Sequence, residues 1–336
     1  MRMKTVFALL KILALLTATN CFAETSQYRY IRLGNDKDVT PKATFALALM
    51  GGGSDLDEAF RWLCDHGNGG DFLILRASGD DVYNRYVKRL CNANSVATLI
   101  MPSRESAEDA AVGDIIRKAE VVFISGGDQA NYTRNWKGTP VEDALNKNIV
   151  EGKPIGGTSA GLAVLGEYVY SAEGDKPDDP DLTSAQVLDD PYTPRVALRR
   201  NFVEISLLKN TLTDTHFAKR DRLGRSIGFL ARIVSDGWSA NPREIAVDEQ
   251  NAVLVEADGR ARVVGSGKGA YFISPQKAPE VCRAGAALSL REITIYRAPS
   301  GSQFDLKQWR GTGGSAYSVA VAEGKLQSTQ PDGQLY

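Results

Sequence analysis

Histidine and cysteine are scarce in this chain of 336 residues, which contains two histidines and four cysteines. Metal sites are built largely from clusters of such residues, and the cysteine spacing here does not match a zinc site. The formal net charge of −1 also lacks the excess of cations that a polyanion-binding surface needs. We therefore expect no metal, no other cofactor and no nucleic-acid partner.

Long hydrophobic runs are missing too, apart from a short one near the N-terminus. Residues 1–11 carry three positive charges, residues 12–18 are apolar, and Ala23 precedes Glu24. This pattern predicts a secretory signal peptide over residues 1–23, cut between Ala23 and Glu24. A lysine leaves the apolar run too short to span a bilayer permanently. We expect the mature chain to be periplasmic or secreted, with no membrane contact after cleavage.

Three cysteines remain after that cleavage: Cys64, Cys91 and Cys282. An oxidising compartment permits disulfides. We expect Cys64 to pair with Cys91, because both fall near the ends of neighbouring predicted helices, and Cys282 to stay free. The alternative is three buried, unpaired thiols.

The first half of the chain alternates short apolar runs with helical periods, and 43% of all residues are hydrophobic. We expect strands at 45–50, 71–77, 96–101, 120–125 and 154–156, and helices at 56–66, 80–91, 107–118 and 141–151. This alternation predicts an α/β fold, a mostly parallel sheet with helices on both faces. Loops 126–129 and 158–161 would then lie at the carboxyl ends of strands, where sites form.

The pattern changes after residue 260 to short strands separated by glycine and proline, such as 291–296 and 316–321. We therefore divide the mature chain into an α/β catalytic domain, residues 24–260, and a β-rich C-terminal extension, residues 261–336, packed on it. The polar end, residues 327–336, is expected to be frayed.

The main chemical signal is the sequence Gly157-Thr158-Ser159-Ala160-Gly161, which joins a buried-strand pattern to a helix-like segment. A Gly-x-Ser-x-Gly turn in that place lifts the serine hydroxyl clear of the sheet. Backbone N–H groups at the start of the helix are free to bind an oxyanion. Ser159 is thus a candidate nucleophile; the alternative is a tight turn with an incidental serine.

A nucleophilic serine needs a positioned base, and only His66 and His216 are available. His66 falls in the last turn of a predicted helix, where it interacts with the helix dipole. His216 follows the apolar run 202–208 and opens a polar, arginine-rich segment, so we favour it. Four acids are chemically able to orient its imidazole: Asp214, Glu244, Asp248 and Glu249.

Two other segments stand near these residues in the predicted fold. The run Gly51-Gly52-Gly53-Ser54 matches no nucleotide-binding loop, and we interpret it as a tight turn beside the active site. Residues 174–181 form an acidic, proline-rich loop, which we interpret as solvated; calcium binding or contact with a cationic substrate is the alternative.

Three motifs in order resemble the cyanophycinase and aspartyl dipeptidase family of serine peptidases, peptidase S51. They are residues 123–129, residues 157–161 and Asp214-x-His216-Phe217-x-x-Arg220-x-Arg222-x-x-Arg225. The resemblance covers roughly residues 45 to 260. It implies a class I glutamine amidotransferase-like, flavodoxin-like fold with serine at the elbow, and a homodimer.

The resemblance also implies residue roles. Ser159 would be the nucleophile, His216 the base and Glu249 the orienting acid, with Asp214 as the alternative acid. The amides of Gly127 and Ala160 would form the oxyanion hole. The implied substrate-binding residues are Asp128, Gln129, Asp214, Thr215, Arg220, Arg222 and Arg225.

Arginine spacing places Arg222 and Arg225 on one helical face, where bidentate contacts to substrate carboxylates are expected. The alternative is that the arginines pair with neighbouring acids. The implied function is a secreted serine exopeptidase that hydrolyses β-aspartyl-arginine polymer, cyanophycin, or related aspartyl peptides through an acyl-enzyme. Thr215 replaces the glutamine that polymer-cleaving members usually carry. The other hypotheses are an aspartyl dipeptidase and a non-catalytic binding protein.

Overall fold

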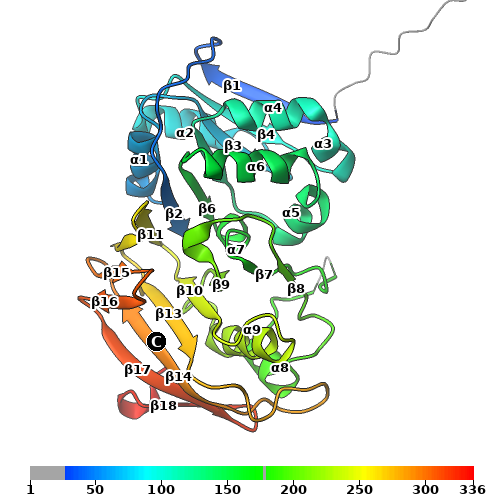
Figure 1. Ribbon diagram of the computed structural model, residues 1–336, viewed down its shortest axis with the longest axis vertical. Helices are drawn as coiled ribbons and strands as arrows, with labels where there is room; N and C mark the ends of the chain where they lie inside the picture. The colour runs from blue at the N-terminus through cyan, green and yellow to red at the C-terminus, as the bar shows by residue number, and fades with distance from the viewer. Residues whose placement is uncertain (1–26, 177–178) are drawn as a thin grey trace, which may run out of the picture.

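The computed structural model describes residues 27–176 and 179–336. Its strands form two sheets, one centred in the upper half of Figure 1 and one in the lower half. The expected signal peptide, residues 1–23, lies outside the described residues. Within the described part of the chain, no helix is long and apolar enough to cross a membrane.

The larger sheet has the strand order β1-β4-β3-β5-β6-β2-β11-β12-β15-β16. Its central strands β4, β3, β5, β6 and β2 pair in parallel, and β1 and β11 flank them antiparallel. The strands are β1 Arg29–Gly34, β2 Ala46–Met50, β3 Phe72–Arg76, β4 Ser95–Ile100, β5 Val121–Ile124, β6 Ile155–Thr158, β11 Asn251–Glu256, β12 Arg260–Gly265, β15 Gln303–Asp305 and β16 Arg310–Thr312.

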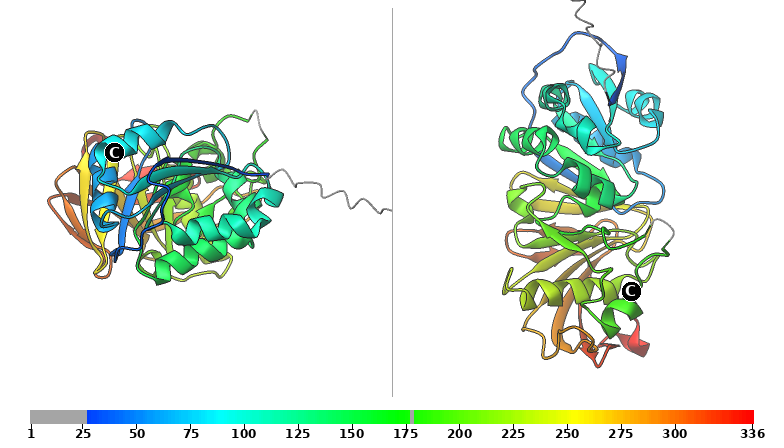
Figure 2. Two further views of the ribbon diagram at one scale, coloured as in Figure 1. Left: turned by 90° about the horizontal axis from the view of Figure 1, so that it is seen from above. Right: turned by 90° about the vertical axis from the view of Figure 1, so that its right-hand side faces the viewer.

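Helices cover both faces of this parallel region, as Figure 2 shows from above. Leu47 and Leu49 of β2 pack with α4, α5 and α6, whereas Ala48 and Met50 pack with α1 and α2 on the other face. Because both faces are buried, these strands are mostly apolar. The helices of this half are α1 Asp57–His66, α2 Val82–Leu90, α3 Arg104–Glu108, α4 Ala110–Lys118, α5 Gln129–Trp136, α6 Pro140–Val150 and α7 Ala160–Ala163. The predicted fold class is confirmed.

In this half the structure differs from the expected elements in one divided helix and in two elements that were missed. The helix expected at 107–118 is two helices, α3 and α4, because Asp109 is extended and its side chain caps α4 by accepting from the Ala111 N–H. Strand β1 and helix α5 were not predicted. The apolar run 202–208 ends in a 3₁₀ turn, Ser206–Leu208, and the strand before His216 is β9, Thr211–Asp214.

The smaller sheet has the order β18-β17-β14-β13-β10-β9-β7-β8. Its elements, with the helices that accompany it, are β7 Tyr168–Tyr170, α8 Ser184–Asp189, β8 Leu198–Arg200, β9 Thr211–Asp214, α9 Leu223–Ser235, β10 Arg243–Val247, β13 Ala270–Pro275, β14 Leu290–Ala298, β17 Ser315–Ala322, β18 Lys325–Ser328 and the 3₁₀ turn Pro331–Gly333. Strand β13 pairs with β10, and β12 pairs with β11. Strands after residue 260 therefore continue both sheets, and the expected division falls at the first residue of β12.

The end of the chain is packed rather than frayed. The Tyr336 hydroxyl donates to Asp221 and accepts from the Leu223 N–H, both at 2.9 Å. Its ring packs edge-on against Phe217 and Tyr271. Aromatic burial outweighs the polar composition from which fraying was expected.

Cys64 of α1 and Cys91, at the end of α2, form a disulfide, and Cys282 is free. This confirms the predicted pairing. The bond joins two helices on the same face of the larger sheet, with Cα atoms 5.8 Å apart.

Replacing both bridged cysteines, Cys64→Ala with Cys91→Ala, is expected to lower the free energy of unfolding by about 3 kcal/mol, because the bond closes a loop in the unfolded chain. The cysteines are 27 positions apart. Urea unfolding measures the loss. Cys282→Ala is the matched control and should cost clearly less. Alkylation of all three cysteines in the denatured, unreduced protein would contradict the assignment.

Candidate active site

Ser159 lies on a sharp turn between β6 and α7. Its backbone has φ 52° and ψ −122°, a region that residues with a Cβ rarely adopt. The flanking glycines are required by close approach: a Cβ on Gly157 would lie 2.5 Å from the Gly161 carbonyl, and one on Gly161 would lie 2.0 Å from the Ile124 oxygen. The turn has the strand-to-helix context that the motif predicts, and it presents the serine hydroxyl to a cleft.

His216 and Glu249 meet Ser159 at this turn. The Ser159 Oγ lies 2.7 Å from His216 Nε2, and His216 Nδ1 lies 2.7 Å from Glu249 Oε1. With its proton on Nδ1, the imidazole donates to Glu249 and accepts from the Ser159 hydroxyl. His216 is 6% exposed. The structure thus brings together the three residues expected to form the catalytic group.

The glycine run after β2 connects the segments that carry these residues. Backbone carbonyls accept one hydrogen bond from each segment: Met50 from Ser159 at 3.1 Å, Gly51 from His216 at 2.8 Å and Gly52 from Gln250 at 2.9 Å. A Cβ on Gly52 would lie 2.4 Å from the His216 ring. The run bends beside the active site, where it was expected to lie, and its lack of side chains makes room for the imidazole.

Two of the other candidate acids are bonded elsewhere, and the third, Glu244, is fully buried with no hydrogen bond to its carboxyl oxygens among the described residues. Asp214 accepts from Arg225 Nε at 3.0 Å, and Asp248 accepts from the N–H groups of Lys219 and Lys268. Burial acts to raise the pKa of Asp214, but Arg225 and Arg222 outweigh it and hold that pKa below its usual value. Burial, with the nearby charge of Asp214, raises the pKa of Glu244 well above its usual range.

The protonation of His216 suits a base. Burial lowers its pKa, and the charges of Arg220 and Arg222 act in the same direction. The hydrogen bond to Glu249 opposes them, and the net pKa lies below the ordinary 6.5. His216 is therefore neutral at physiological pH, with Nε2 free to accept a proton. The other histidine, His66, ends α1, with Nδ1 2.8 Å from the Trp62 oxygen and outside the cleft.

Ser159 and His216 open onto a cleft of about 620 Å³. The hydrogen bonds of the described residues include none donated by the N–H of Gly127 or of Ala160, so both amides are available to an oxyanion. Asp214 lies beneath the cleft and does not line it. The other expected substrate-binding residues do line it: Asp128, Gln129, Thr215, Arg220, Arg222 and Arg225.

The three arginines differ in how accessible their guanidinium groups are to a ligand. Arg225 is 2% exposed and its guanidinium is held by Asp214. Arg222 is 7% exposed and donates to Asp181 at 2.9 Å and to the Thr215 oxygen at 3.0 Å. Arg220 is more open, and it pairs with Asp181 at 3.0 Å. The alternative of ion pairing with acids therefore describes all three arginines, and Arg220, which also lies 3.8 Å from Glu249, is the most accessible of them.

Sequence reasoning gave no role to Arg134, which lines the cleft, and it gave the acidic loop a contact with substrate only as the alternative to a solvated loop. Arg134 comes from α5, and Asp175, Lys176 and Asp179 come from the acidic loop after β7. The composition of the loop indicated charge. Its position against Ser159 depends on the path between β7 and α8, for which the sequence carries no local signal.

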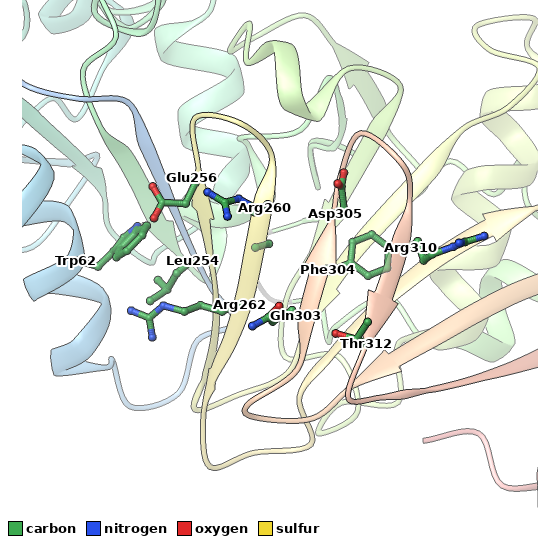
Figure 3. Close-up of a pocket in the computed structure, with 11 residues that line it drawn as sticks. Trp62, Leu254, Glu256, Arg260, Arg262, Gln303, Phe304, Asp305, Arg310 and Thr312 are labelled. Carbon is green, nitrogen blue, oxygen red and sulfur yellow. The ribbon is translucent and has the colours of Figure 1, made fainter.

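A second cavity, of about 370 Å³, lies on the α1 side of β11, β12, β15 and β16 (Figure 3). Asp305 is the register partner of Arg260 on one neighbouring strand and of Arg310 on the other, whereas the Arg260 guanidinium pairs with Asp258 at 2.7 Å. No serine, cysteine or histidine lines it. Across residues 27–176 and 179–336, no group of three or more His, Cys, Asp or Glu side chains is placed to hold a metal.

Part of this chain is similar to a known peptidase family and to named proteins. Residues 74–216, which include Ser159 and His216, match the family described as Peptidase family S51. A cyanophycinase from Synechococcus elongatus is 32% identical over 175 residues, 51% of this chain and 47% of that protein. A cyanophycinase from Trichormus variabilis is 26% identical over 223 residues, 64% of this chain and 67% of that protein. The chain thus spans about half the length of the first relative.

Among solved structures, a peptidase from an acI-B1 Actinobacterium aligns with a TM-score of 0.46 at 17% identity. The alignment covers 85% of this chain and 98% of that one.

Arg220→Gln is expected to raise the pKa of His216, because it removes a cation that opposes protonation of the imidazole. Since only the neutral imidazole accepts a proton, the acid limb of the Ser159 acylation rate should move to higher pH. The pH dependence of labelling by a fluorophosphonate measures it. Arg260→Gln, at an exposed arginine outside the cleft, is the control. An unchanged or lowered midpoint in Arg220→Gln would contradict the assignment.

Proposed function

We propose that this chain, whose residues 74–216 belong to peptidase family S51, is a serine peptidase. One observation carries the proposal: Ser159, His216 and Glu249 form a continuous hydrogen-bonded series with 2.7 Å at each step. That series opens onto a cleft large enough for a peptide segment.

The geometry supports acyl transfer to Ser159. The Oγ attacks the substrate carbonyl carbon while His216 Nε2 takes its proton, and Glu249 stabilises the resulting imidazolium. The N–H groups of Gly127 and Ala160 bind the oxyanion. His216 then gives its proton to the leaving amine. The same imidazole deprotonates a water molecule, whose oxygen bonds to the acyl carbon; the bond from that carbon to Ser159 Oγ breaks, and Oγ takes the proton from His216.

We propose aspartyl peptides as the substrate class, with β-aspartyl-arginine polymer as the leading candidate and exopeptidase action from the chain end. Two relatives are named cyanophycinase. A polymer of this kind carries both carboxylates and guanidinium groups. The cleft offers partners to each, with Arg220 and Arg134 as cations and Asp128 and Asp179 as anions.

Short Asp-Xaa dipeptides are the second candidate, favoured by the state of Thr215. Its hydroxyl oxygen lies 3.2 Å from Arg222 Nη1 and its carbonyl oxygen accepts from the same atom at 3.0 Å. The short side chain is thus bonded within the protein, at the position where polymer-cleaving members usually carry a longer amide.

Export from the cytoplasm is part of the proposal. The leader pattern of residues 1–23 supports it, and so does the disulfide between Cys64 and Cys91, since such bonds persist in oxidising compartments. A homodimer stays a prediction of the family resemblance.

The test of substrate is incubation of the mature protein with insoluble cyanophycin and, separately, with Asp-Xaa dipeptides, followed by mass analysis. Release of β-aspartyl-arginine favours the polymer and terminal cleavage. Hydrolysis of dipeptides alone favours the second candidate. Absence of any product, together with absence of a Ser159 adduct on exposure to a fluorophosphonate, would contradict a peptidase and favour a binding protein.

Ser159→Ala and His216→Ala are each expected to reduce turnover by at least about 100-fold, because nucleophile and base act as one unit. Ser159→Ala should also abolish the phosphonate adduct seen by intact-protein mass spectrometry. Ser318→Ala, at an exposed serine of β17, is the control. Full activity in Ser159→Ala would refute the mechanism, provided that circular dichroism shows the same fold.

A further inference from the structure

We propose that Tyr132 is a positioning residue: it sets the orientation of the peptide unit between Gly126 and Gly127 and so aims the Gly127 N–H at the oxyanion. This inference rests on the proposed function, because it concerns an acyl transfer at Ser159.

Tyr132 is held firmly in the protein interior. It is 1% exposed, and its ring stacks on Trp136 with centroids 4.4 Å apart. The Trp136 indole in turn donates to the Met101 carbonyl at 3.3 Å. Two buried aromatic rings on successive turns of α5 therefore fix the place of the tyrosine hydroxyl.

That hydroxyl contacts the loop between β5 and α5. Tyr132 Oη lies 3.0 Å from the Ser125 oxygen and 3.1 Å from the Gly126 oxygen, so its single proton is shared between two carbonyls. The Ser125 hydroxyl also donates to the Gly126 oxygen, at 3.1 Å. Of the two hydroxyls that hydrogen-bond to the Gly126 oxygen in the described chain, that of Tyr132 comes from outside the loop.

Because the peptide bond between Gly126 and Gly127 is trans, the contact of Tyr132 with the Gly126 oxygen also fixes the direction of the Gly127 N–H. The described chain contains no cis peptide bonds, and in a trans unit the carbonyl and the next N–H point in opposite directions. Because Tyr132 holds the Gly126 oxygen on the buried side, the Gly127 N–H faces the other side. Gly127 lines the cleft there.

The same loop lies against the nucleophile. A Cβ on Gly126 would lie 3.4 Å from the Ser159 Cβ and 3.9 Å from its Oγ. Two successive glycines leave the peptide unit between them free to rotate unless something holds it. An oxyanion donor is effective because it is fixed in place before the reaction, so an amide that rotates freely stabilises the oxyanion much less.

The test is Tyr132→Phe, which keeps the ring and removes the hydroxyl. We expect the rate of Ser159 labelling by a fluorophosphonate, and kcat for p-nitrophenyl acetate, to fall by about 10-fold or more, with KM within about twofold of wild type. The acid limb of the labelling rate should keep its midpoint, because His216 and Glu249 are untouched.

The matched control is Tyr317→Phe. Tyr317 is also buried, and its hydroxyl donates to the Leu335 oxygen at 2.7 Å, in the smaller sheet. This variant should label at the wild-type rate. An equal loss in Tyr317→Phe, or a moved acid limb in Tyr132→Phe, would overturn the inference, since either would indicate general loosening.

A second variant tests the contact between Tyr132 and the loop by changing the loop instead of the tyrosine. A Cβ on Gly127 would lie 2.9 Å from Tyr132 Oη but 3.7 Å from the ring carbon that bears it. Gly127→Ala should therefore slow labelling in the wild-type protein and have a smaller additional effect in Tyr132→Phe. Should Tyr132→Phe fail to fold, a wild-type labelling rate in Gly127→Ala would still overturn the inference.

The outcomes distinguish a failure of the proposed function from a failure of the role assigned to Tyr132. Failure of the wild-type protein to form a Ser159 adduct would count against the proposed function itself. A wild-type protein that reacts normally, with Tyr132→Phe reacting equally fast, would count against the role of Tyr132 alone.

Discussion

The absence of side chains at Gly51 and Gly52 is the constraint on which the site depends. Three chain segments that carry Ser159, His216 and Glu249 hydrogen-bond to consecutive carbonyls of this region, and the imidazole occupies the space that a Cβ on Gly52 would fill. The segments come from two different sheets. The glycine run therefore fixes the positions of the catalytic residues, which come from both halves of the molecule, relative to one another.

The parallel half of the fold could be predicted from local pattern, because each strand there is buried on both faces and each helix has one apolar side. Segments whose formation depends on a single residue were less predictable. Asp109 divides one expected helix, and the Asp128 carboxylate starts α5 by accepting from the Ala130 N–H. The smaller sheet was the least predictable, because β10 and β13 are joined by pairing that no local sequence pattern encodes.

The site shows the same division between local and long-range information. Ser159 could be selected because its turn has a sequence signature, and His216 because few histidines compete with it. The choice between Glu249 and Asp214 could not be made from residue types, since both are carboxylates near the base. Folding decides it by charge: Arg225 is buried against Asp214, which leaves Glu249 to meet the imidazole.

The buried pair of Asp214 and Arg225 also explains why the loop that carries His216 can be so irregular. His216 has a φ of 48°, which costs free energy, and it lies between strand β9, which ends at Asp214, and helix α9, which carries Arg225. A buried ion pair adds little net stability, but separating its charges in the interior is costly. The pair therefore holds the two ends of the loop together. Burial and the charge of Asp214 raise the pKa of nearby Glu244, so the neutral form of this carboxyl is favoured beside the pair.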